Sequence, residues 1–164
     1  MASPIPDGYH SVTPLLVIRD AARALEFYKQ AFGAQERFRK LQPTGKVLHA
    51  EIAIGDSIIK LADECDPHPG HDQRCLAAPT SLKNTPVNLY YYVENVDEVF
   101  SRAVHAGATV VMPVADMFWG DRVGQLNDPF GHSWSIATHQ EDVSPPQLDE
   151  RIAKSFARKP AAAR

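Results

Sequence analysis

The sequence lacks a long hydrophobic run, a surplus of basic residues and more than two cysteines. No apolar stretch approaches the roughly 20 residues that span a bilayer, and residues 1–8 lack the basic segment and hydrophobic run of a secretory signal. Lysine and arginine number 17 against 20 acidic residues, without the basic stripe typical of nucleic-acid-binding proteins. We therefore expect a cytoplasmic protein that binds neither nucleic acid nor membrane, with Cys65 and Cys75 as reduced thiols.

The first half of the chain carries the pattern of one strand, one helix and three further strands. An apolar run from Val12 to Ile18 predicts a buried strand. Asp20 can cap the helix that follows, and Gly33 stands where a glycine commonly ends a helix. Further strands are expected over residues 35–41, 47–54 and 57–61.

The second half repeats this order of elements. A strand from Val87 to Val93 precedes a helix that starts at Asn95 and ends at Gly107. Strands are expected over residues 109–112, 123–126 and 133–138. Gly33 and Gly107, which end the two helices, lie 74 positions apart, and the turn glycines Gly55 and Gly131 lie 76 apart. This near-constant offset indicates an internal duplication.

The predicted fold is therefore α+β, with two βαβββ repeats in one domain. We divide the chain into a lead-in over residues 1–10, a domain over 11–140 and a tail over 141–164 that contains a short helix. Within the domain, repeat one covers 11–64, a polar linker covers 65–86 and repeat two covers 87–140.

Several stretches of the sequence resemble a known family. They are Asp20 to Tyr28, Phe32 to Ala34, Phe118 to Arg122, Asp128 to His132 and Trp134 to His139. Together they resemble the vicinal oxygen chelate superfamily (the glyoxalase, bleomycin-resistance and dioxygenase fold), and within it the PhnB-like branch. The resemblance covers residues 12–142 and implies that the two repeats form a concave cleft with the helices on its convex side. It also implies a homodimer.

Metal-dependent members of this family hold one divalent ion in the cleft, with ligands from the first and fourth strands of each repeat. The resemblance places these positions on Thr13, Lys60, Asn88 and Ser135. An ammonium repels a divalent cation, and serine and threonine hydroxyls are weak donors. We therefore expect no metal cofactor at the usual position.

Alternation along the strands predicts what lines the cleft instead. The expected ligand-binding residues are Thr13, Lys60, Asn88, Tyr90, Tyr92, Trp119, Arg122, Ser135 and His139. Aromatic rings, cations and hydrogen-bonding groups in one cleft suit a planar or anionic small molecule. The favoured function is thus binding of a small organic molecule, as in bleomycin-resistance proteins, and it predicts affinity for a planar or cationic-aromatic compound. The alternative is that Tyr90 and Tyr92 are packing residues and that Glu51 simply pairs with Lys60.

An enzyme remains the second hypothesis, and the sequence does not decide between the two. His49 and Glu51 lie two apart on one strand face, and with Lys60 they are the candidate catalytic residues. They could act as an acid–base pair, or as a displaced metal site with His132 or His139 as a third ligand. The activity would then be of the lyase, isomerase or dioxygenase type.

The linker holds one further pattern. Its cysteines and histidines have a zinc-like spacing, at Cys65, His68, His71 and Cys75. The same segment carries two prolines and a glycine, which favours a flexible loop between the repeats over a structural zinc site.

Overall fold

The described part of the chain folds into two four-stranded sheets and four helices. The structure is a computed structural model that describes residues 3–65 and 76–157. The first half contains β1 (Leu15–Ile18), α1 (Ala21–Phe32), β2 (Gln35–Leu41), β3 (Val47–Ile54) and β4 (Ser57–Asp63). Its strands are ordered β1-β4-β3-β2, with β1 parallel to β4 and the other pairs antiparallel.

The second half has the same topology. It contains β5 (Asn88–Tyr92), α3 (Val96–His105), β6 (Thr109–Asp116), β7 (Asp121–Asn127) and β8 (Ser133–His139). Its strands are ordered β5-β8-β7-β6, and β5 is parallel to β8. The short α2 (Pro79–Leu82) precedes this half, and α4 (Pro145–Ala157) follows it. The predicted α+β fold of two βαβββ repeats is confirmed.

Local signals start and stop the two long helices of the repeats. The Asp20 carboxylate accepts a hydrogen bond from the amide of Arg23 at 3.2 Å and caps α1. Gly33 ends the same helix with a φ of 67°, a left-handed conformation that glycine adopts at little cost. The Asn95 side chain caps α3 in the same way, through the amide of Glu98.

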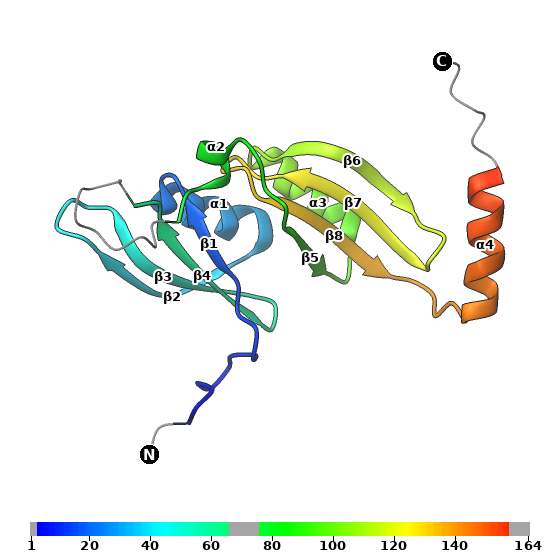
Figure 1. The fold of residues 1–164 in the computed structure, drawn as a ribbon, viewed down its shortest axis with the longest axis horizontal. Coiled ribbons are helices and arrows are strands. Elements are labelled where there is room, and N and C mark those ends of the chain that lie inside the picture. The colour runs from blue at the N-terminus through cyan, green and yellow to red at the C-terminus, as the bar shows by residue number, and fades with distance from the viewer. Residues whose placement is uncertain (1–2, 66–75, 158–164) are drawn as a thin grey trace.

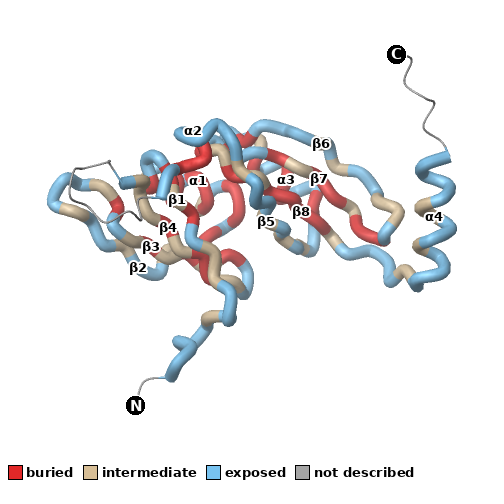
Figure 2. The backbone as a smooth tube through the Cα atoms, in the orientation of Figure 1, coloured by how far each residue is buried: buried red, intermediate tan, exposed pale blue. Residues whose placement is uncertain are grey.

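The two halves share one hydrophobic core. Helices α1 and α3 lie against each other behind the two sheets (Figure 1). Phe32 of α1 packs on Trp134 of β8, with ring centroids 4.7 Å apart, and Arg102 of α3 donates a hydrogen bond to the carbonyl of Ala31. Buried residues concentrate along α1 and in the middle of the strands (Figure 2). The sheets are therefore held side by side, each with one face toward a helix.

A buried carboxylate links the halves through polar contacts as well. Asp128 lies in the turn before β8, and its Oδ2 accepts hydrogen bonds from the hydroxyl of Tyr28 at 2.7 Å and the indole of Trp134 at 3.0 Å. Its Oδ1 accepts from the amides of Phe130 and His132, both at 2.9 Å. Tyr28 lies on α1 of the first repeat and is fully buried, whereas Asp128 belongs to the second repeat. Their hydrogen bond therefore connects the two repeats inside the core.

The observed strands differ from the expected ones mainly at their ends. The first strand begins at Leu15 rather than Val12, because Pro14 has no amide to donate and only its carbonyl is paired, with the amide of Lys60. Strand β6 continues past Met112 to Asp116, with a register shift that accommodates Pro113. The short α2 lies in a segment expected to be loop.

The linker gives one correction. Cys65 forms a disulfide, so the expectation of a reduced thiol at this position is wrong. A disulfide sulfur is not a thiolate ligand, and this argues against zinc at Cys65. The other members of the linker pattern, His68, His71 and Cys75, lie outside the described residues.

Helix α4 stands at one end of the molecule and buries none of its residues (Figure 2). Arg151 attaches it to the preceding segment through two hydrogen bonds to Glu141, at 2.6 and 2.9 Å. Over the described ranges, no helix combines the length and apolarity that crossing a membrane requires.

Candidate functional site

Each sheet has an open face, meaning the face that does not pack on α1 or α3. On the second sheet this face carries a cluster of aromatic, acidic and imidazole side chains. Tyr90 and Tyr92 come from β5, Trp119 from the turn before β7, Asp121 from the start of β7 and His139 from the end of β8. We name these five residues the Asp121 cluster.

The carboxylate of Asp121 organises this cluster. Its Oδ2 accepts hydrogen bonds from the hydroxyls of Tyr90 and Tyr92 at 3.3 and 3.0 Å and from the indole of Trp119 at 3.2 Å. Its Oδ1 lies 2.8 Å from Nδ1 of His139, which donates the fourth bond. The four other side chains of the cluster all donate to this one carboxylate, so the orientations of their rings depend on Asp121.

The backbone around Gly120 positions that carboxylate. The amide of Met117 bonds to the carbonyl of Asp121, and the carbonyl of Gly120 accepts from the amides of Gln140 and Glu141. Gly120 has a φ of +100°, and a Cβ there would collide with the carbonyl oxygen of Glu141. A glycine is thus required at the turn that brings Asp121 opposite His139 in the β7–β8 ladder.

The cluster is charged although its centre is buried. Burial alone would raise the pKa of Asp121, but its four hydrogen bonds outweigh this effect and hold the pKa below its ordinary value. Burial and the nearby Asp121 raise the pKa of Tyr90 to about 12, so its hydroxyl stays a donor. Hydrogen bonds to Asp121 and Asp142 raise the pKa of His139. The carboxylate is therefore ionised at neutral pH.

The rings of the cluster remain accessible despite these bonds. Tyr90, Tyr92 and Trp119 are 46%, 57% and 38% exposed. The two tyrosine rings lie with centroids 5.1 Å apart at an angle of 44°. Exposed aromatic rings that are fixed by a buried anchor form a pre-organised surface for a ligand.

The open face of the first sheet carries a second cluster, built from His49, Glu51, Lys60 and Tyr9. Nε2 of His49 lies 3.0 Å from Oε1 of Glu51, and Lys60 is the cross-strand neighbour of Glu51. Tyr9, in the segment before β1, donates its hydroxyl to Glu51 and lays its ring 5.4 Å from Nζ of Lys60. The hydrogen bond from Tyr9 contributes most to lowering the pKa of Glu51.

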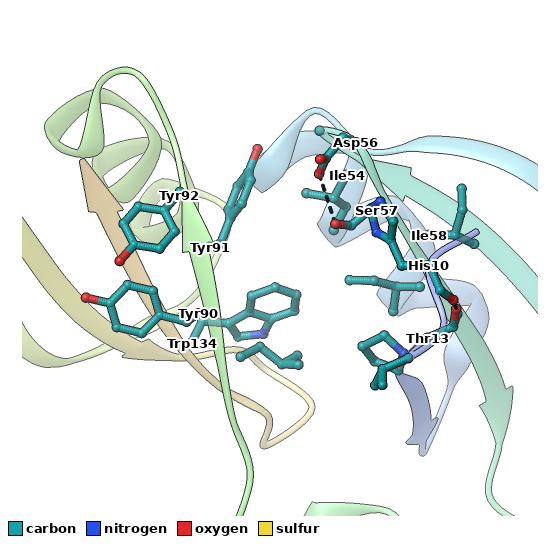
Figure 3. Close-up of a pocket in the computed structure, with 15 residues that line it drawn as sticks. His10, Thr13, Ile54, Asp56, Ser57, Ile58, Tyr90, Tyr91, Tyr92 and Trp134 are labelled. Carbon is teal, nitrogen blue, oxygen red and sulfur yellow. Dashed lines mark hydrogen bonds between the residues drawn. The ribbon is translucent and has the colours of Figure 1, made fainter. Parts of the chain in front are cut away.

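A groove of about 680 Å³ separates the two halves. Figure 3 shows Tyr91 and Trp134 on its one side and His10, Thr13 and the β3–β4 turn on the other. Tyr90 and Tyr92 also border it, but their hydroxyls point away from it, toward the open face of the second sheet (Figure 3). The strand alternation of β5 thus divides its tyrosines between two surfaces.

The remaining expected site residues are dispersed. Thr13 borders the groove, and its hydroxyl donates to the carbonyl of His10. Asn88 donates to the hydroxyl of Ser133 at the far end of β5. Ser135, the β8 partner of Tyr90, is only 1% exposed.

Arg122 lies on the opposite face of β7 from Asp121. It forms ion pairs with Asp97 at the start of α3 and with Asp116 of β6, at 2.8 and 2.9 Å. The expectation that Arg122 lines the cleft with Trp119 therefore does not match its position, because neighbouring residues of a strand point to opposite faces.

The four positions at which the family holds a metal do not fit a divalent ion. Lys60 faces an aromatic ring, Ser135 is buried, and Thr13 and Asn88 are bonded to neighbours. Within the part of the chain that the structure describes, no three His, Cys, Asp or Glu side chains are arranged to hold a metal. His132, a possible third partner for His49 and Glu51, faces the carbonyl of Val17 instead.

The sequence pattern predicts neither Asp121 nor Tyr9 as a site residue. It places the start of β7 at residue 123, two residues after Asp121, and so leaves Asp121 in a loop. Tyr9 lies in a lead-in without periodicity, and we find no local signal that brings it to Glu51.

Comparisons with known proteins agree with this architecture. The model of the Glyoxalase/Bleomycin resistance protein/Dioxygenase superfamily matches residues 9–136. An uncharacterized protein of Mycobacterium bovis is 41% identical over 143 residues, which are 87% of this chain and 92% of that protein.

Two solved structures are similar in fold. TioX from Micromonospora sp. ML1 has a TM-score of 0.59 at 25% identity and covers 82% of this chain and 100% of its own. The PhnB protein of Bacillus cereus has a TM-score of 0.60 at 21% identity, with 79% and 99% covered. On the family match and the shared fold, the chain belongs to the Glyoxalase/Bleomycin resistance protein/Dioxygenase superfamily.

Proposed function

We propose that this protein binds a small organic molecule with an aromatic system on the open face of its second sheet. The observation that carries this proposal is the Asp121 cluster, in which three exposed aromatic side chains are held by one buried carboxylate. Ordering the rings before binding removes part of the entropy cost that a ligand otherwise has to overcome. Such a surface stabilises a flat ligand by stacking and by burial of apolar area.

Tryptophan fluorescence tests this proposal directly. The chain has two tryptophans, Trp119 in the cluster and the buried Trp134 in the core, so a ligand on the cluster should quench Trp119. We expect titration with flat aromatic compounds such as acridine to give saturable quenching. Trp119→Leu removes the reporter ring, so its affinity is measured by titration calorimetry, and we expect binding to weaken about fivefold or more, roughly 1 kcal/mol.

Phe156→Leu is the control, since it removes an even more exposed aromatic ring from α4, away from the cluster. The proposal fails if no aromatic compound binds saturably, or if both variants bind as tightly as the parent.

We further propose that the protein is a homodimer in which the open faces meet. Strands β1 and β5 are both sheet edges, and apolar side chains beside them are exposed, among them Val12, Leu15 and Val87. Light scattering on Val87→Glu should show a shift to monomer; a parent that is monomeric at high concentration excludes the dimer.

Acid–base catalysis at the first open face is the second candidate function. The 3.0 Å contact between His49 and Glu51 favours it, because a carboxylate bonded to an imidazole is a common proton-transfer pair. Lys60 beside them supplies a positive charge for an anionic intermediate. Glu51→Gln should abolish any turnover of a candidate carbonyl substrate while leaving quenching of Trp119 by a bound aromatic unchanged.

A further inference from the structure

The charge of the Asp121 cluster determines which ligands it favours. The Asp121 side chain is 6% exposed, and its recorded hydrogen-bond and ion-pair partners, among the residues that the structure describes, include no lysine or arginine. Three of its four donors are neutral hydroxyl or indole groups. They stabilise the carboxylate without cancelling its charge.

Two cationic side chains of adjoining segments are engaged elsewhere. Arg122 points to the helix-covered face and is held between Asp97 and Asp116. Arg151 is paired with Glu141. Another acid, Asp142, lies 3.0 Å from His139 and is fully exposed. The surroundings of the cluster are therefore negative whenever His139 is neutral.

The aromatic rings add to this preference. The face of a tyrosine or tryptophan ring is electron-rich and attracts a cation placed over it. The polar hydrogens of the three rings are directed at Asp121, so they are not free to donate to an anionic ligand. An anion would also be repelled by the carboxylate beneath, which favours the cationic-aromatic ligand over the anionic one among those that the sequence left open.

We propose that the Asp121 cluster is a binding site for an organic cation, a flat aromatic amine or quaternary ammonium compound seated over Tyr90, Tyr92 and Trp119 with Asp121 as its counter-charge. This inference rests on the proposed binding function and names the class of its ligand. Asp121 acts on the ligand through its field and through the ring orientations that it fixes.

Three acridines of one shape and different charge test this inference. They are 10-methylacridinium, a permanent cation; acridine, which is neutral in mildly alkaline buffer; and acridine-9-carboxylate, an anion. With the full-length protein we expect the cation to bind about tenfold more tightly than neutral acridine, and the anion to bind most weakly. Added salt should reduce the preference.

Two variants locate the preference in the cluster. Asp121→Asn should remove the tenfold advantage of the cation, whereas Asp116→Asn, which removes an exposed carboxylate on the opposite face, should keep it. If Asp121→Asn does not fold, Tyr92→Leu serves instead, because it removes an exposed ring and leaves the carboxylate in place. Its affinity for 10-methylacridinium should fall about fivefold, with an unchanged circular dichroism spectrum.

The outcomes separate the two levels of the proposal. Equal binding of the three acridines overturns the cation site and leaves the binding function standing. Binding of none of them overturns both. A cation preference that Asp121→Asn and Tyr92→Leu both retain shows that the cation binds elsewhere, and the assignment to this cluster is then wrong.

Discussion

Removing one hydroxyl from the core should measure how strongly the two repeats are joined. In Tyr28→Phe the ring still packs between Phe32 and Trp134, but Asp128 loses the bond that reaches it from α1. A hydrogen bond to a charged group contributes about 1.5–3 kcal/mol. Because Asp128 keeps its three other donors, no charge is left unpaired, and we expect a loss of about 2 kcal/mol in the free energy of unfolding.

Asp128→Asn should cost more than Tyr28→Phe. Each carboxylate oxygen of Asp128 accepts two hydrogen bonds. In asparagine an NH₂ group replaces one of these oxygens, and it cannot accept from the two donors that point at it. At least one of the donors that lose their acceptor is buried, and each unsatisfied group costs about 1–3 kcal/mol. The expected order of stability is therefore parent, Tyr28→Phe, Asp128→Asn.

Thermal and urea unfolding by circular dichroism measure both changes. A loss of 2 kcal/mol lowers the midpoint of a chain of this size by about 4–8 °C. Tyr91→Phe is the control, since that ring packs on Phe32 and no hydrogen bond of its hydroxyl is recorded among the described residues; it should stay within about 0.5 kcal/mol of the parent. If Tyr28→Phe is as stable as this control, the polar link between the repeats contributes nothing and the reasoning is refuted.

Three further predictions concern packing and pH. Gly124→Ala places a Cβ about 2.5 Å from the ring of Phe100 and should lower the free energy of unfolding by about 1–3 kcal/mol. Adding Phe100→Leu to this variant should recover part of that loss, as measured by urea unfolding. Hydrogen bonds from Ser81, Ala78 and Arg19 lower the pKa of Glu64 to about 2. The stability that ionised Glu64 contributes is therefore complete above its unfolded pKa of 4.5 and is lost as the pH falls toward 2. Glu64→Gln should lose less stability than the parent over this pH range, and identical acid unfolding profiles of the two proteins would refute the prediction. Protonation of His139, whose pKa Asp121 and Asp142 raise, adds a positive charge beside the cluster while Asp121 stays ionised and Tyr90 and Tyr92 stay neutral. The affinity for 10-methylacridinium should therefore rise with pH through that pKa, and His139→Gln should give a flat profile; a pH dependence that survives this substitution would assign the effect to another group.

Much of the fold follows from signals that act locally. Asp20 and Gly33 bound α1 through contacts within a few residues, and alternation in β3 separates the buried Ile52 from the open-face Glu51. Where a strand begins depends instead on its partner. β1 starts at Leu15 because of how Pro14 meets the amide of Lys60, a contact between residues far apart in the sequence.

The site is predictable only as far as alternation reaches. It places Tyr90 and Tyr92 on one face of β5, but their convergence on Asp121 requires the register between β7 and β8 and the left-handed turn at Gly120. A shift of one residue in the start of β7 exchanges Asp121 for Arg122 on that face, which changes the sign of the charge offered to a ligand. The aromatic residues are therefore easier to predict from the sequence than the residue that sets their chemistry.

The convergence of four side chains on Asp121 constrains how this surface can change. Replacing one ring alters the area available to a ligand, but replacing the carboxylate releases all three rings and the imidazole at once. A descendant of this chain that needed a ligand of the opposite charge could not reach it by exchanging aromatic residues one at a time. Its selectivity is set by a residue that the ligand need not touch, so a change of ligand class has to begin beneath the surface.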